Sequence, residues 1–475
     1  MSHFLSILAS PHTRRCTLAL VACLGPAAAQ TPPNHRSAPK KMLAGDIAAL
    51  HTALDAYDQG NLSSAEPVLR NLATKYPKSY EANEALGSLY AETGDLARAL
   101  PFLHQSCMIA PQEALAHANL GAAYLKSNNG AAAVKELETA TTLDPKNGAS
   151  QSNLGQALLL TRRPKAAAKA FKAAADITPN NPELQYNLAL ALYQSGSAHE
   201  AADLLEHLPS AETNDQIQAL AADAEEQTGN YEKALGHFQT AARLNPSDAN
   251  LYALTTELLR HWTWPEAINV ANYGSIRYPA STHFRMAAGI ANYGKSDYKE
   301  AVRIFSKLLE ADPNNAAIAD LLGRSCSLLA DGEDQGCTAI GDFAERHPGN
   351  AASTTYAAVA ILHAPKEKQD LGRAESLLRS AIAADPQYAE AYFQLGVLEQ
   401  TRLQWKESAI ALEKSIALRP SSPEAHYRLS RAYTHLGRRD EAQAEIALHQ
   451  TYAEQAKNHL DAKLQEVVRF LLKPS

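Results

Sequence analysis

The chain has 475 residues, of which 45% are hydrophobic and 20% are charged. This balance is typical of a globular protein and excludes a wholly disordered, collagenous or multi-span membrane protein. Lys and Arg number 44 against 51 Asp and Glu, a net charge of -7. Because no basic run is long enough to follow a phosphate backbone, we expect no nucleic-acid partner.

The first 29 residues have the pattern of a secretory signal peptide. Arg14 and Arg15 precede an apolar run over 16–24, and small residues at 27–29 form a cleavage site. The run is far shorter than the roughly 20 apolar residues of a transmembrane helix, so we predict export without a membrane span. Residues 20–23 also resemble the lipobox of bacterial lipoproteins, and in that alternative Cys23 carries a lipid anchor. Residues 30–45, rich in Pro, Lys and Ser, predict a flexible lead-in.

A small residue, nearly always alanine, recurs over residues 46–456 at intervals of 33 or 34, with one gap of 73. Its positions are Ala65, Ala99, Ala133, Ala167, Ala201, Ala234, Ala267, Ala301, Ala374, Ser408 and Ala442. A proline follows most of them after twelve residues, at Pro77, Pro111, Pro145, Pro179, Pro246, Pro279, Pro313, Pro386 and Pro420. Because proline ends a helix, this phase predicts a helix that stops at the same point of every repeat.

Leu-Gly pairs precede several of these small residues, at Leu86-Gly87, Leu120-Gly121, Leu154-Gly155 and Leu395-Gly396. A glycine inside a helix costs about 1 kcal/mol relative to alanine, so its recurrence predicts the close approach of another helix. Further glycines mark the following turn, at Gly60, Gly94, Gly229 and Gly437. Each repeat is therefore predicted to be a tight helical hairpin.

This pattern resembles the tetratricopeptide repeat, a 34-residue helix-turn-helix with Leu-Gly-x-x-Tyr, then Ala, then an aromatic such as Phe171, Phe238 or Phe305, then Pro. In that frame, twelve repeats begin at residues 46, 80, 114, 148, 182, 215, 248, 282, 316, 355, 389 and 423. The resemblance implies an all-α fold, a right-handed α-α superhelix in which stacked hairpins share one core. An insertion around 364–369 interrupts the tenth repeat.

In this family the first helix of each hairpin lines a concave groove that holds a peptide or a partner helix. The sixth residue of repeats three, four and five is Asn119, Asn153 and Asn187. They resemble the asparagine ladder of the protein O-linked N-acetylglucosamine transferases, in which amide side chains pair with an extended peptide. Tyr186 and Tyr193 would add apolar contacts. The alternative is that these asparagines only bond to neighbouring helices.

Repeat nine contains Cys326 near the end of its first helix and Cys337 near the start of its second, with Gly332 between them. An antiparallel hairpin brings such positions face to face, and export favours disulfides, so we predict a bond. The alternative is two buried thiols. Cys107 is expected to be a free, buried thiol.

Repeats eleven and twelve place Phe393, Gln394, Arg428 and Arg431 on the same groove face. Guanidinium groups there suit an acidic ligand. Glu390 and Glu424 lie nearby in the sequence, so a solvated salt-bridge face is the alternative. After Ala442 an i, i+4 apolar stripe runs on to Leu471 and predicts a C-terminal capping helix at 457–475, with partner docking as the alternative.

Catalytic and metal-binding motifs are missing from the sequence. It has no Gly-rich phosphate loop, no His-Glu-x-x-His, no Gly-x-Ser-x-Gly and no Cys-x-x-Cys, and its 17 histidines are expected on solvated helix faces. We therefore expect no enzyme, no metal and no cofactor. The expected function is a protein-binding scaffold of the bacterial envelope, periplasmic or lipid-anchored; the alternative is an accessory structural subunit of an envelope enzyme or export complex.

Overall fold

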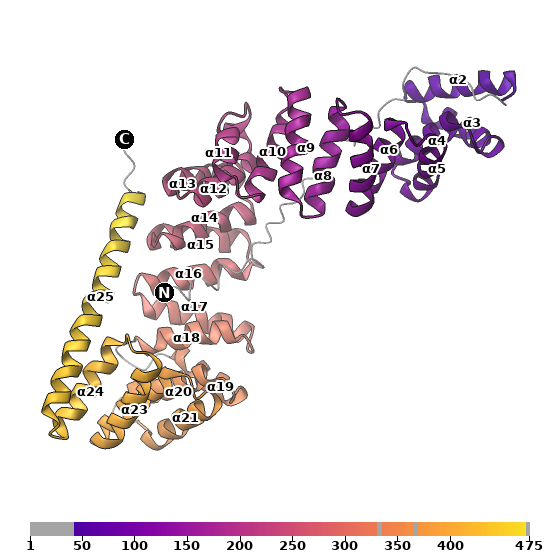
Figure 1. Cartoon of the computed structure of the whole chain (residues 1–475). Coiled ribbons are helices and arrows are strands. Elements are labelled where there is room, and N and C mark those ends of the chain that lie inside the picture. Colours follow the sequence, from indigo (N-terminus) through magenta and orange to yellow (C-terminus); the bar gives the residue numbers. More distant parts are fainter. Residues whose placement is uncertain (1–41, 330–334, 365–368, 472–475) are drawn as a thin grey trace. The chain divides into compact units, whose positions relative to one another are not determined.

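The computed structural model describes residues 42–329, 335–364 and 369–471, with side chains described up to Asn458. Within these ranges all regular structure is helical, arranged as successive hairpins (Figure 1). No described helix is both long enough and apolar enough to cross a membrane. The predicted signal peptide at 1–29 with Cys23, the lead-in up to residue 41, and Gly332 lie outside the described residues.

Twelve first helices and twelve second helices alternate along the described chain. The first helices are α2 (Ala44–Asp58), α4 (Tyr80–Glu92), α6 (Ala114–Lys126), α8 (Gly148–Leu160), α10 (Pro182–Gln194), α12 (Asp215–Thr228), α14 (Asp248–Arg260), α16 (Thr282–Gly294), α18 (Ala316–Ser327), α20 (Ala351–His363), α22 (Ala389–Thr401) and α24 (Pro423–His435). The second helices are α3 (Leu62–Lys75), α5 (Leu96–Ile109), α7 (Gly130–Leu143), α9 (Pro164–Ile177), α11 (Ala198–Glu206), α13 (Tyr231–Leu244), α15 (Trp264–Arg277), α17 (Tyr298–Ala311), α19 (Thr338–Arg346), α21 (Leu371–Ala384), α23 (Trp405–Leu418) and α25 (Arg439–Leu471). Two 3-10 helices, η1 (Ala211–Thr213) and η2 (Gln335–Cys337), complete the set.

The described residues form two compact bodies, which we call the N-terminal body (42–244) and the C-terminal body (245–471). In both bodies each helix packs against the next one in sequence. First helices also contact the first helix of a neighbouring repeat, as α4 does with α6 and α22 with α24. Within each body the fold is therefore a stack of hairpins that share their cores.

The recurring small residues are almost completely buried in these cores. Their exposed fraction is 0% at ten of the eleven positions and 8% at Ala442. Where serine replaces alanine, the Ser408 hydroxyl donates to the Gly396 carbonyl at 2.9 Å, which satisfies the buried group. Phe171, Phe238 and Phe305 are buried as well.

Repeat boundaries follow from proline and from turn geometry. Each of the nine recurring prolines lies two residues beyond the last residue of a second helix, as Pro111 lies beyond Ile109. The turn between the helices contains a left-handed residue: Gly94 has φ 82°, and Leu403 occupies the corresponding place with φ 61°. A non-glycine residue there costs roughly 1–2 kcal/mol, which the packing of the flanking helices must offset.

Ten first helices begin at the first residue expected for their repeat. The first helix of repeat one begins at Ala44 instead of 46, and that of repeat ten begins at Ala351 instead of 355. The latter shift arises because the extra residues of repeat ten lie in the turn after His363, so the helix before them starts earlier. Part of that insertion, at 365–368, is outside the described residues.

The last helix differs from the expected boundary at residue 457. The second helix of repeat twelve continues without a break as α25, from Arg439 to Leu471. Its first part packs on α24, where His449 Nδ1 lies 2.9 Å from the Pro423 carbonyl oxygen and Tyr452 stacks on His426. The apolar stripe from Leu460 onward belongs to side chains outside the described set.

Candidate functional site

Five of the first helices share a side-chain hydrogen bond that anchors their starts. The fourth residue of several repeats bonds the carbonyl oxygen of the proline six residues earlier. The pairs are Asn83 with Pro77, His117 with Pro111, Gln151 with Pro145, Gln185 with Pro179, and His426 with Pro420. A polar residue six positions after proline was the sequence signal for this contact, which our sequence analysis missed. The contact fixes the entry of the first helix after the proline turn.

The structure contradicts the prediction of an asparagine ladder in an open groove. Asn119 and Asn153 are buried, with exposed fractions of 6% and 8%, and only Asn187 is half-buried. The Asn119 amide on α6 donates to Glu84 Oε1 at 2.6 Å and to Ser88 Oγ at 3.3 Å, both on α4. The neighbouring first helix, α4, thus takes up the Asn119 amide that was expected to bind a peptide. For Asn119 the alternative interpretation is therefore confirmed: its side chain bonds to a neighbouring helix.

Glu84 forms the centre of a buried polar cluster in the N-terminal body. Its exposed fraction is 2%, and burial, despite the hydrogen bond from Asn119, raises the pKa of its carboxyl group to about 7. Its second oxygen, Oε2, and the nearby Tyr80 hydroxyl are buried without a hydrogen-bond partner among the described residues. Buried polar atoms without partners are rare, so this cluster is a candidate site.

The predicted aromatic pair lies on one face of α10. Tyr186 and Tyr193 are seven residues apart, two helical turns, so both project from the same side. Both are half-buried and pack, with Leu159 of α8, against the core that includes Leu190. The first helices of repeats four and five therefore present a partly accessible apolar and aromatic strip, which we call the α10 strip (Leu159, Tyr186, Tyr193).

The charged groups of repeats eleven and twelve bond to one another. Arg428 donates to Glu424 at 3.1 Å, while Glu390 accepts from Gln394 at 2.9 Å and from Arg419 at 2.7 Å. These two groups of bonds agree with the alternative interpretation, a solvated salt-bridge face. Arg431 is exposed, and Phe393 packs partly buried against the core beside Leu412.

Cys326 and Cys337 form the predicted disulfide, with a Cα–Cα distance of 5.8 Å. The bond joins the end of α18 to η2, directly before the short helix α19. Both half-cystines are buried. Cys107 is the free cysteine of the described residues and is also buried.

The expectation that the histidines lie on solvated faces is wrong at three positions. His117, His261 and His426 have exposed fractions of 9%, 3% and 2%. His117 Nδ1 lies 2.7 Å from Glu136 Oε2, and a donor atom of Cys107 lies within 4.8 Å of both side chains' donor atoms. Sequence reasoning missed this cluster because its members come from three helices and match no metal-binding spacing.

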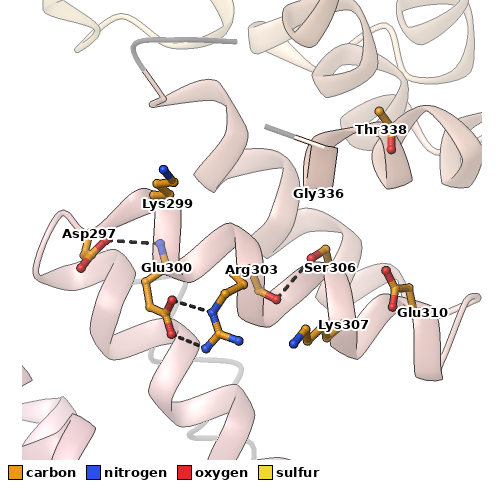
Figure 2. Close-up of a pocket in the computed structure, with 9 residues that line it drawn as sticks. All are labelled: Asp297, Lys299, Glu300, Arg303, Ser306, Lys307, Glu310, Gly336 and Thr338. Carbon is orange, nitrogen blue, oxygen red and sulfur yellow. Dashed lines mark hydrogen bonds and ion pairs between the residues drawn. The ribbon is translucent and has the colours of Figure 1, made fainter. Parts of the chain in front are cut away.

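An open surface hollow of about 830 Å³ lies along α17, opposite Gly336 and Thr338 (Figure 2). Several of its polar groups bond to one another within this segment. Asp297 accepts from the Glu300 backbone N–H at the start of α17, and Arg303 donates to the Glu300 carboxylate, which lowers the pKa of Glu300. With basic and acidic groups alternating and solvated, the hollow has the character of an ordinary helix surface.

Comparisons with known proteins agree with the repeat pattern. Models described as tetratricopeptide repeat match residues 50–114, 118–182, 158–224 and 423–447. No curated protein matches the chain in sequence.

Among solved structures, the Naa15/Naa10 complex bound to HypK-THB is 14% identical, with a TM-score of 0.37 over 85% of this chain and 68% of that one. YrrB, described as a TPR protein with an unusual peptide-binding site, is 20% identical with a TM-score of 0.37, over 39% of this chain and 95% of that one. The pilF protein of Pseudomonas aeruginosa is 20% identical with a TM-score of 0.36, over 43% and 94%.

Proposed function

We propose that this chain, in which tetratricopeptide repeat family models match residues 50–114, 118–182, 158–224 and 423–447, is a non-enzymatic scaffold of the bacterial cell envelope that binds a protein segment on its first helices. Proteins of this family serve as protein-protein interaction scaffolds. The finer proposal is that the ligand contacts the α10 strip and that the protein works after export.

The α10 strip carries this proposal. Tyr186 and Tyr193 are large, half-buried aromatic side chains on the same face of a first helix. Partly buried tyrosines have little conformational entropy left to lose when they bind, and aromatic residues dominate the energetics of protein interfaces. Since Asn119 and Asn153 are buried, we propose that apolar contacts, rather than amide ladder bonds, supply the affinity.

The Cys326–Cys337 bond supports export, because disulfides persist in oxidising compartments and are rare in the cytosol. The signal-peptide pattern of residues 1–29 points the same way. We propose a periplasmic or envelope-associated location, with a lipid anchor at Cys23 as the alternative form.

The proposal is tested by using the exported chain as bait in envelope extracts and comparing it with Tyr186→Ala/Tyr193→Ala. We expect the double variant to bind its partner at least about 30-fold more weakly and to recover correspondingly less of it, since each lost anchor costs at least about 1 kcal/mol. The control is Tyr231→Ala, which removes an exposed tyrosine from a second helix of the same body.

Equal recovery by the double variant and the wild type would place the ligand elsewhere and contradict the α10 strip. A single partner that co-elutes with the chain at fixed stoichiometry, and is retained by the double variant, would favour the accessory-subunit alternative.

A further inference from the structure

We propose that Cys107, His117 and Glu136 bind a zinc ion that joins repeats two and three. The three residues lie on consecutive helices, α5, α6 and α7. One donor atom of each, a sulfur, an imidazole nitrogen and a carboxylate oxygen, lies within 4.8 Å of the other two. Cys107 and His117 are buried, and the Glu136 side chain is 14% exposed, so the donors converge in a place largely shielded from solvent.

The orientation of His117 suits a metal ligand. Its Nε2 lies 3.2 Å from the Pro111 carbonyl oxygen, and because a carbonyl oxygen only accepts, Nε2 carries the proton. Nδ1 faces Glu136 Oε2 at 2.7 Å, so a proton or another cation must lie between these two lone-pair atoms. Metal-binding histidines usually donate their other ring N–H to a carbonyl or carboxylate in this way. A divalent cation can take the place of the shared proton.

The charge around the cluster also favours a cation. The carboxyl groups of Glu84 and Glu136 lie near enough to the Cys107 thiol to interact with it electrostatically. Lys135 Nζ lies 3.7 Å from Glu136 Oε1, but the Lys135 side chain is 83% exposed. The buried Oε2 of Glu84 and the Tyr80 hydroxyl have no hydrogen-bond partner among the described residues. Among the described residues, this part of the core therefore gathers a thiol, a hydroxyl and two carboxyl groups, all of which can face a cation.

The donor set favours zinc over calcium and magnesium. Zinc accepts thiolate, imidazole and carboxylate ligands in tetrahedral geometry, whereas calcium and magnesium take oxygen ligands. Tetrahedral zinc with its usual bond lengths separates these donors by about 3.4–3.6 Å. The site therefore requires the Glu136 carboxylate to move away from Nδ1 by less than about 1 Å and the Cys107 sulfur, now within 4.8 Å of both, to approach them by up to about 1.2 Å, with the fourth position left to water.

Repeat twelve provides an internal comparison. His426 Nδ1 lies 2.5 Å from Glu445 Oε2, and Nε2 lies 2.7 Å from the Pro420 carbonyl oxygen, with the same sequence spacings as around His117. The residue that corresponds to Cys107 there is Ile416. The His-Glu pair alone thus has a structural role, and the thiol distinguishes the proposed metal site.

The test titrates the EDTA-treated, dialysed full chain with Zn²⁺ in a calorimeter. We expect about one zinc per chain, and with Co²⁺ as the probe we expect a thiolate-to-metal charge-transfer absorption. Cys107→Ala should lose that absorption and His117→Gln should bind zinc at least about 100-fold more weakly. Glutamine is the matched replacement, because Gln151 and Gln185 make the same bond to the proline carbonyl in their repeats.

His426→Gln is the control and should leave zinc affinity unchanged. A wild-type chain without saturable zinc binding, or with zinc binding unaltered by both Cys107→Ala and His117→Gln, overturns the proposal. If either variant fails to fold by circular dichroism, the wild-type Co²⁺ spectrum decides: its thiolate band supports the site, and a spectrum without it refutes the site.

Discussion

Gly121 on α6 lies so close to Leu137 on α7 that a β-carbon at position 121 would lie 2.5 Å from Leu137 Cγ. The same contact, always between residues 16 apart, recurs along the chain. The other pairs are Gly87 with Leu103, Gly155 with Phe171, Gly289 with Phe305, and Gly396 with Leu412. Glycine therefore sets the distance between the two helices of a hairpin, which is the close approach predicted for Gly87, Gly121 and Gly155.

Gly121→Val is expected to lower the free energy of unfolding by about 1–3 kcal/mol, because the added atoms overlap the fully buried Leu137. Urea denaturation followed by circular dichroism measures the change. Gly236→Val is the matched control, since a β-carbon at 236 on α13 meets nothing within 4 Å, and it should change stability by less than about 0.5 kcal/mol. Equal effects of both variants would contradict the close contact.

Removing the disulfide with Cys326→Ala/Cys337→Ala is expected to cost about 3 kcal/mol, because the bond closes a loop with a sequence separation of 11 and restricts the unfolded chain. Thermal melts of the oxidised chain, the reduced chain and the double variant provide the comparison, and reduction should have no effect on the variant. In unreduced protein, mass spectrometry should find the peptides of 326 and 337 linked with a loss of two hydrogens. Two free thiols at these positions in the exported chain would be the contrary result.

Asn119→Ala is expected to destabilise the chain by about 1–3 kcal/mol, because it removes the donor that bonds the buried Glu84 carboxylate at 2.6 Å. Asn187→Ala serves as the control at the same repeat position, where the side chain is half-buried, and should cost less than about 0.5 kcal/mol. Chemical denaturation of both variants gives the difference. A neutral Asn119→Ala with weakened ligand binding would restore the ladder that the structure argues against.

Glu84 is expected to make the chain less stable as the pH rises. Its pKa is about 7 in the folded protein against 4.5 ordinarily, so between these values the folded state holds a proton that the unfolded state has released. Stability from this group is complete below about pH 4.5 and is lost up to about pH 7, by at most about 3 kcal/mol.

Glu84→Gln keeps an oxygen that can accept from Asn119 but cannot ionise. Unfolding free energies measured from pH 4 to 8 in the presence of EDTA should show the wild type falling below this variant as the pH rises. Parallel curves for the two proteins would mean that the Glu84 carboxyl titrates at its ordinary pKa.

The sequence alone determined the hairpins and much of their internal register. The period of 33 or 34 residues located the first residue of ten first helices, and the phases of alanine, glycine and proline located the core, the helix crossing and the helix ends. These features are predictable because they depend on contacts within one repeat, between positions a fixed distance apart in sequence. The Cys326–Cys337 bond belongs to the same class, since both residues lie in one hairpin.

Contacts between successive repeats were decided only by the tertiary structure. The pattern placed Asn119 in an open groove, but the packing of α6 on α4 buries it against Glu84. It placed the histidines on solvated faces, but His117 meets Glu136 and Cys107 where three helices converge. A period fixes which face of a helix points inward. It does not fix which polar side chains of the next helix fill the space opposite, because that depends on the distance and angle between repeats and on the individual side chains that meet there.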